Sequence, residues 1–151
     1  MSATTDLYEQ DFYAWTMKNA KLLRRRQLTE VDLEHLAEEL ESMGKSERRE
    51  LMSRLTQLLL HLLKWRLQAE LRSRSWLVSI QNQRIAIGKL LKDSPSLKAA
   101  LEPFYAEVYA DAVSLAEAET GIDRKDFPAS CPFTLEQALS DRFLPDEHTA
   151  A

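Results

Sequence analysis

The sequence predicts an all-α fold, a single compact domain in which about five main helices and a short C-terminal helix pack around a central leucine-rich helix. Only three glycines and five prolines occur in 151 residues, so few positions interrupt a helix. Helix formers such as Leu, Ala, Glu and Arg are abundant, whereas β-branched residues are few. Apolar residues also recur at every third or fourth position, which is typical of helices that bury one face.

The strongest helical pattern runs from Leu51 to Leu63 and continues through Trp65. Ser46 is placed to cap this helix, and a charged first turn follows it. We expect this segment to be the central and best-buried helix, because its apolar residues recur at helical steps. Its main stripe comprises Leu51, Leu55, Leu58, Leu62 and Trp65.

Two helices are expected before the central one. The first runs from a cap at Thr5 or Asp6 to about Arg26. The second spans about residues 30–43 and ends at Gly44, because glycine suits the left-handed conformation at a helix end. On the second helix three glutamates face away from the apolar arc, and that arc consists of Leu33, Leu36, Ala37, Leu40 and Met43.

Serine and proline signals divide the chain after the central helix. Either Ser73 or Ser75 is expected to cap a helix from Trp76 to about Leu91. Ser94 can cap the next helix, with a proline at its first position.

That next helix is expected to reach about Thr120 and to end at Gly121, with Pro103 bending it or splitting off its first turn. Thr134 and Gln137 form a capping-box pattern that opens a short helix to about residue 139. We expect residues 6–145 to be ordered and residues 146–151 to fray, within one domain that covers 1–151.

The charge is distributed unevenly along the chain. Residues 45–92 carry eleven basic and three acidic side chains, whereas residues 93–151 carry four basic and twelve acidic ones. A basic middle could dock two acidic flanks within the fold, or part of it could face an anionic partner.

The leading functional hypothesis is a non-enzymatic interaction or regulatory module that binds a protein partner or a second copy of itself. Arginines and tryptophans, which are enriched at interface centres, gather at one corner of the chain. The alternative is that both tryptophans belong to the core and the arginines form internal ion pairs. The binding candidates are Lys64, Trp65, Arg72, Arg74 and Trp76, with Arg84 behind them.

Arg84 shares a helix face with core-type apolar residues, so its charge needs a partner. Glu39 lies at the border of the apolar arc of its own helix, and Asp111 has helical spacing with apolar residues. We therefore expect Arg84 to pair with a carboxylate, and Glu39 and Asp111 are the candidates.

Other classes of function have weaker support. The basic segment 64–84 could bind nucleic acid, but the pI is near 5.5 and no nucleic-acid-binding motif is present. A metal site could use only His35, Glu39 and His61, and the chain has no Glu-x-x-His pair. Cys131 has no activating histidine nearby, so a structural thiol is expected. No cofactor or catalytic residue is predicted, and an enzyme of unknown reaction is the third class of function, after an interaction module and a nucleic-acid-binding protein.

The N-terminal segment is acidic and lacks an apolar run, so we expect no signal peptide. His61 breaks the longest apolar run of the chain, so we expect no membrane span. A single cysteine agrees with a reducing compartment, and the expected location is the cytoplasm.

Seven short segments occur in a characteristic order: Asp11–Trp15, Asp32–Gly44, Ser46–Arg49, His61–Trp65, Arg72–Trp76, Asp93–Leu97 and Cys131–Pro132. Together they resemble the bacterial family known as domain of unknown function 29, over about residues 7–145. The resemblance implies an all-helical soluble domain with no established activity. The chain departs from the family pattern at Ala69, where proline is common, and at His35, where asparagine is common. The second departure argues against His35 as a required metal ligand.

Overall fold

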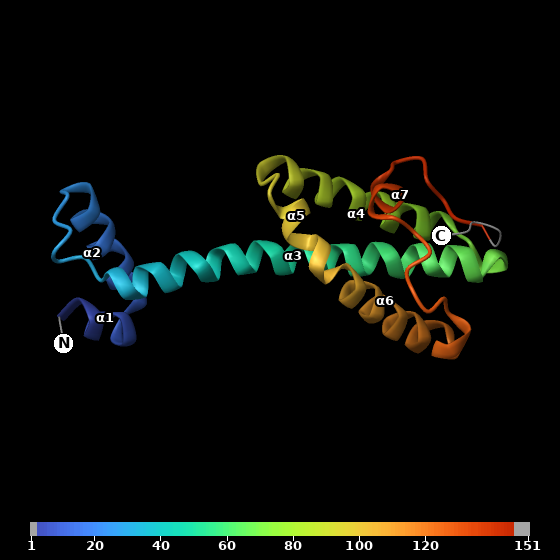
Figure 1. Ribbon diagram of the computed structural model, residues 1–151, viewed down its shortest axis with the longest axis horizontal. Coiled ribbons are helices and arrows are strands. Elements are labelled where there is room, and N and C mark those ends of the chain that lie inside the picture. The colour runs from blue at the N-terminus through green and yellow to red at the C-terminus, as the bar shows by residue number, and fades with distance from the viewer. Residues whose placement is uncertain (1–2, 147–151) are drawn as a thin grey trace. The chain divides into compact units, whose positions relative to one another are not determined.

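The computed structural model describes residues 3–146, and this part of the chain is all-α, without strands, as the sequence predicts (Figure 1). None of the helices in this range is sufficiently long and apolar to span a membrane. The α-helices are α1 (Ala3–Gln10), α2 (Phe12–Arg24), α3 (Leu33–Leu67), α4 (Arg74–Asp93), α5 (Leu97–Leu101), α6 (Tyr105–Thr120) and α7 (Leu135–Leu139). Short 3-10 turns lie at η1 (Ala69–Leu71), η2 (Glu102–Phe104) and η3 (Arg124–Asp126).

The chain divides into two compact units, an N-terminal unit of residues 1–46 and a C-terminal unit of residues 47–151. The expectation that residues 1–151 form a single domain stays a prediction. Of the end that is expected to fray, only Asp146 lies among the described residues.

The N-terminal unit contains α1, α2 and the first turns of α3. The prediction of one helix from a cap at Thr5 or Asp6 to Arg26 is wrong, because α1 begins at Ala3 and a break at Asp11 separates it from α2. The Asp11 carboxylate accepts a hydrogen bond from the Ala14 amide at 3.0 Å, so this side chain caps α2.

The predicted helix end at Gly44 and the cap at Ser46 are also wrong, because α3 is continuous across both positions. Gly44 does not adopt a positive φ, whereas Gly121 does. Strong helix formers lie on both sides of Gly44, and a glycine inside a helix costs only about 1 kcal/mol relative to alanine. This cost is smaller than that of ending the helix and leaving its last carbonyls without donors.

Replacing Gly44 by alanine is therefore expected to stabilise the protein by about 0.5–1 kcal/mol, measured by urea denaturation. A methyl group at this position meets no atom within 4 Å. Gly121→Ala is the matched control and should destabilise, because φ at Gly121 is 77°. If Gly44→Ala also destabilised the protein, a left-handed helix end at residue 44 would be indicated instead.

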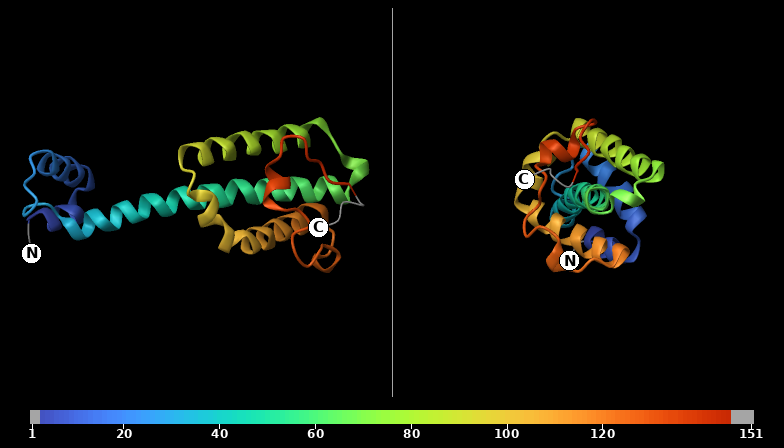
Figure 2. Two further views of the ribbon diagram at one scale, coloured as in Figure 1. Left: turned by 45° about the horizontal axis from the view of Figure 1, so that its top comes forward. Right: turned by 90° about the vertical axis from the view of Figure 1, so that its right-hand side faces the viewer.

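The C-terminal unit is built around the second half of α3. Figure 2 shows α4 and α6 running along different sides of this helix, which explains why its leucines are buried around most of its circumference. The predicted central stripe is confirmed for its leucines, whereas Trp65 is only half-buried. The fully buried leucines of α3 are Leu51, Leu55, Leu58, Leu59, Leu60, Leu62 and Leu63.

Local capping signals set most of the remaining boundaries. The break after the central helix is confirmed, and the Ser73 hydroxyl accepts a hydrogen bond from the Trp76 amide at the start of α4. Gly121 ends α6 in the left-handed conformation, and Thr134 and Gln137 form the predicted capping box of α7.

The boundary around Ser94 differs from its prediction. Ser94 follows α4 as its C-cap, and α5 begins only at Leu97, after Ser96. Pro103 lies in η2 and separates α5 from α6, which is one of the two predicted outcomes.

Candidate functional site

The predicted cationic corner lies where α3 ends and α4 begins. The Lys64 Nζ atom forms an ion pair with Glu119 at 3.0 Å and lies 4.7 Å from the centroid of the Trp76 ring. The Lys64 side chain is only 15% exposed. Its ammonium group therefore interacts with a carboxylate of α6 and with the face of an aromatic ring.

Arg72, the second cation of this corner, also has interaction partners within the protein. The Arg72 guanidinium lies 4.9 Å from the Trp65 ring, and its Nε donates to the Trp65 carbonyl at 2.7 Å. Arg74, on the first turn of α4, is exposed. These contacts show how two cations are used inside the fold, and they favour the structural interpretation of Lys64 and Arg72.

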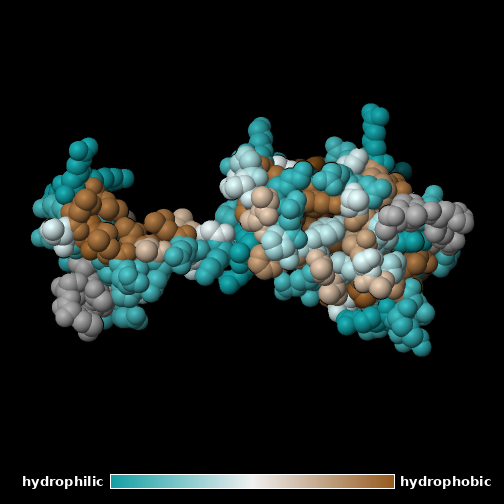
Figure 3. Space-filling view, viewed as in Figure 1, coloured by the Kyte–Doolittle hydropathy of each residue, from teal (hydrophilic) through white to brown (hydrophobic). Residues whose placement is uncertain are grey.

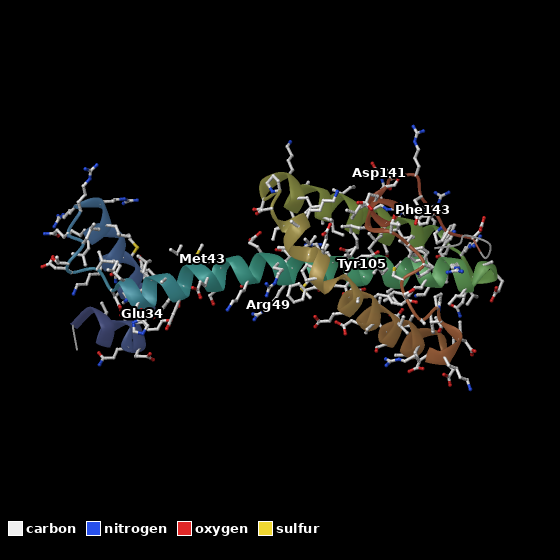
Figure 4. All side chains as sticks on the ribbon, in the orientation of Figure 1. Glu34, Met43, Arg49, Tyr105, Asp141 and Phe143 are labelled. Atoms are coloured by element: carbon white, nitrogen blue, oxygen red, sulfur yellow. The ribbon has the colours of Figure 1, made fainter. Side chains whose placement is uncertain are left out.

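Arg84 is buried on α4, as its place on an apolar stripe predicts, and its side-chain hydrogen bonds go to main-chain carbonyls rather than to Glu39 or Asp111. Its Nε donates to the Ala138 carbonyl at 2.8 Å and its Nη2 to the Phe143 carbonyl at 2.7 Å. Figure 4 shows Phe143 and Asp141 in the C-terminal segment that these bonds hold. Burial lowers the pKa of the guanidinium, and the nearby charge of Asp141 opposes that effect. Main-chain carbonyls satisfy this arginine because its planar fork can reach two of them.

The two proposed carboxylate partners have other surroundings. Asp111 is exposed on α6 and lines a shallow cavity of about 490 Å³ with Arg49 and Gln57. Glu39 is half-buried in the N-terminal unit, where it accepts a hydrogen bond from the Tyr8 hydroxyl at 2.5 Å. This bond, together with the smaller effects of burial and of nearby charges such as that of Glu39, raises the pKa of Tyr8 to about 12.

A polar network in the N-terminal unit was not predicted from the sequence. Asp32 Oδ2 accepts hydrogen bonds from Trp15 Nε1 at 2.9 Å and from His35 Nδ1 at 2.8 Å. Asn19 accepts from the Asp32 amide and donates to the Trp15 carbonyl, each at 2.9 Å. The Tyr8 ring stacks on His35 with centroids 3.9 Å apart. The network thus joins all three helices of this unit and satisfies its buried polar groups.

The network also shifts the pKa values of Asp32 and His35. Burial tends to raise the pKa of Asp32, but hydrogen bonds from His35 and Trp15 outweigh it, so this pKa lies below its ordinary value of 3.8. The bond to Asp32 raises the pKa of His35 above 6.5, against the smaller effect of burial. The bond of protonated His35 to Asp32 makes its full contribution to the free energy of unfolding below pH 6.5. This contribution is lost as the pH rises through the raised pKa of His35. That from Asp32 is complete above pH 3.8 and is lost as pH falls through its lowered pKa.

Replacing Asp32 by asparagine is expected to bring the pKa of His35 down toward 6.5, because the charged acceptor is removed. An NMR titration of the His35 ring measures this shift directly. Glu41→Gln removes an exposed charge from the same helix and is the matched control, which should leave the titration of His35 unchanged. An unaltered His35 pKa in Asp32→Asn would contradict the hydrogen bond between the two side chains.

The weak metal candidates are engaged in other contacts. His35 and Glu39 belong to the network above, and His61 Nδ1 donates to the Gln57 carbonyl of its own helix at 2.8 Å. Across residues 3–146, no group of three or more His, Cys, Asp or Glu side chains could hold a metal ion.

Cys131 lies beside a cavity of about 560 Å³ that α6 forms with the segment after η3. Its Sγ is 3.5 Å from the Tyr105 hydroxyl, which donates to the Phe133 carbonyl at 2.9 Å. Burial raises the pKa of the Cys131 thiol, and hydrogen bonds only partly offset that effect. A thiol that is held protonated is a poor nucleophile, so these contacts fit the structural role expected of it.

The N-terminal unit has a surface of exposed apolar side chains. Eight large apolar side chains of this unit are between 39% and 65% exposed. Figure 3 shows hydrophobic residues over α2 and the first turns of α3. We call this set the apolar face: Phe12, Tyr13, Met17, Leu23, Leu28, Leu33, Leu40 and Met43.

The α3 part of the apolar face belongs to the apolar arc predicted for residues 30–43. An apolar arc is typical of a helix face that packs against a core, but three members of this arc, Leu33, Leu40 and Met43, are exposed. Figure 4 places Met43 and Glu34 on opposite sides of α3, so the predicted segregation of apolar and acidic residues is present. The periodicity identified an apolar surface correctly, and among residues 7–46, whose side chains the structure describes, none covers Leu33, Leu40 or Met43.

The model of the family described as Domain of unknown function DUF29 matches residues 7–144, which is nearly the whole chain. Searches of curated proteins and of solved structures found no similar protein. By the family match, this chain belongs to the DUF29 family.

Proposed function

We propose that this protein is a helical interaction module that binds another polypeptide through the apolar face of its N-terminal unit. The observation that carries the proposal is the size of this face, because eight large apolar side chains at about half exposure are unusual for a unit of 46 residues. Burying such side chains against a partner would supply the hydrophobic driving force for association.

The cationic corner supports this function less directly. Arg74 is exposed and Trp65 and Trp76 are half-buried, so the corner could add a second contact surface. Lys64 and Arg72 are already paired with protein groups. Phosphate binding would require those contacts to break, so the contacts do not favour the nucleic-acid alternative. A cytoplasmic location and a bacterial source are expectations that accompany this proposal.

The proposal can be tested by site-specific photo-crosslinking in cells that naturally produce the protein. A photoreactive amino acid at Leu40 should form a covalent adduct with a discrete polypeptide, because this side chain is 60% exposed in the apolar face. The same amino acid at Leu115, an exposed leucine of α6, is the matched control and should give no such adduct. Failure of the Leu40 probe to form any adduct, in a protein with wild-type helicity, would overturn the proposed function.

A further inference from the structure

We infer that the partner of the apolar face is a second copy of this chain, which packs through a two-fold contact between N-terminal units. This inference rests on the interaction function proposed above and specifies its partner. Four features of the N-terminal unit carry it: its small core, the spacing of its exposed residues on α3, the area of its apolar face and the separation of its charges.

The core of the N-terminal unit is small for its length. Among the side chains described there, residues 7–46, the buried apolar ones are Trp15 and Val31, and the other buried side chains are the polar Asn19 and Asp32. Units of about 40–60 residues are marginally stable and commonly need oligomerisation to complete a core. A second copy would supply such a core, because each unit would bury the apolar face of the other.

The exposed residues on α3 have the spacing of a helix–helix seam. Leu33 and Leu40 are seven residues apart, with Ala37 between them and Gly44 one further turn along. A stripe of this kind stays on one side of a helix over several turns. The small side chains of Ala37 and Gly44 would let a second helix approach closely, since interaxial distance depends on the residues at the contact.

The available area is close to what a dimer needs. Eight large apolar side chains at about half exposure offer roughly 90 Å² each, or about 700 Å² in total. A standard interface buries about 800 Å² on each partner, including its polar rim. The apolar face with its charged border is therefore large enough for a specific two-chain contact.

The charges beside the apolar face are complementary to each other. All five basic side chains of residues 1–44 lie between Lys18 and Arg26, whereas the exposed glutamates Glu34, Glu38 and Glu41 lie on α3. Within the described residues none of these charged side chains forms an ion pair. In a two-fold contact the same patch occurs on both sides, so the basic α2 of one copy can face the acidic α3 of the other.

Measuring the molecular mass of the full-length protein by light scattering across the micromolar range tests this inference. The expected mass is twice the chain mass of 17.4 kDa. The double variant Leu33→Glu/Leu40→Glu should be monomeric, with an association constant at least about 100-fold weaker, because each copy would bring two charges into the seam. Leu77→Glu/Leu115→Glu alters two exposed leucines of the C-terminal unit and should remain dimeric.

A charge swap distinguishes a specific interface from non-specific hydrophobic association. Helical geometry puts Arg24 within the exposed arc of α2, beside Met17, and Lys21 at the border of that arc. On the polar side of α3, Glu34 and Glu41 are the glutamates nearest to the border of the apolar arc, which ends at Ala37. Lys21→Glu/Arg24→Glu should weaken the dimer about 10-fold. Adding Glu34→Lys/Glu41→Lys to the same chain should restore it, because both borders are then inverted. Circular dichroism would verify that each variant remains helical.

The outcomes distinguish the partner from the function. A monomer throughout the concentration range, or a dimer that survives Leu33→Glu/Leu40→Glu, would overturn the second copy as partner. A Leu40 photo-adduct with a different polypeptide would then still support the interaction function. No adduct and no dimer together would overturn both.

Discussion

Replacing Leu59 by alanine is expected to lower the free energy of unfolding of the C-terminal unit by roughly 3–5 kcal/mol. Leu59 is fully buried in α3 and belongs to the core that α4 and α6 help to form. Its truncation removes apolar surface from the core and leaves a cavity that neighbouring helices fill only in part. Urea denaturation followed by fluorescence is a suitable measurement, because Trp65 and Trp76 lie in this unit.

Leu115→Ala is the matched control for this substitution. The substitution removes the same atoms from α6, but Leu115 is 40% exposed. It should therefore lower the free energy of unfolding by less than about 1.5 kcal/mol. Equal losses for the two variants would contradict the position of Leu59 at the centre of the core.

Arg84→Met is expected to cost about 2–4 kcal/mol of unfolding free energy. Methionine keeps an unbranched side chain of moderate length but has no donor, so the carbonyls of Ala138 and Phe143 would lose their hydrogen-bond partner. A buried polar group that loses its partner costs about 1–3 kcal/mol. Arg84→Lys should recover only part of the loss, because one ammonium group does not reproduce a planar fork. Urea denaturation measures the cost.

Trypsin provides a local readout for the same variant. Arg142 is exposed and lies between the two carbonyls that Arg84 binds, so release of the segment should speed cleavage after Arg142. Arg74→Met, at an exposed position of the same helix, should leave both the stability and the cleavage rate close to those of the wild type. An Arg84→Met protein with unchanged cleavage would show that these hydrogen bonds do not hold the C-terminal segment.

Short-range signals explain why much of the fold could be predicted from the sequence. The caps at Ser73, Thr134 and Gly121 depend on residues within a few positions of each other, so local chemistry is enough to locate them. Asp11 carried an equally local capping signal, but it lies within a longer apolar pattern that continues on both sides. The predicted helix end at Gly44 was wrong because a glycine can either end a helix or lie inside it. Inside a helix it costs only about 1 kcal/mol relative to alanine.

Long-range contacts explain what the sequence could not supply. The position of Arg84 on an apolar stripe predicts burial, but every residue carries a carbonyl, so no residue type identifies its partners. The network around Asp32 depends on how α1 and α2 pack against α3, which spacing along the chain does not determine. On α3, periodicity located the arc of Leu33 and Leu40 but could not indicate which surface would cover it.

The two hydrogen bonds of Arg84 also bear on which sequence changes the C-terminal segment can tolerate. Both acceptors are main-chain oxygens, so substitutions at Ala138 and Phe143 that preserve the backbone would leave the acceptors in place. Deleting or inserting one residue between them would instead move one acceptor out of reach of a rigid guanidinium. Arg84 therefore constrains the length of the chain between Ala138 and Phe143 more strongly than its residue identities. Homologous sequences are expected to vary in this stretch while they keep its length.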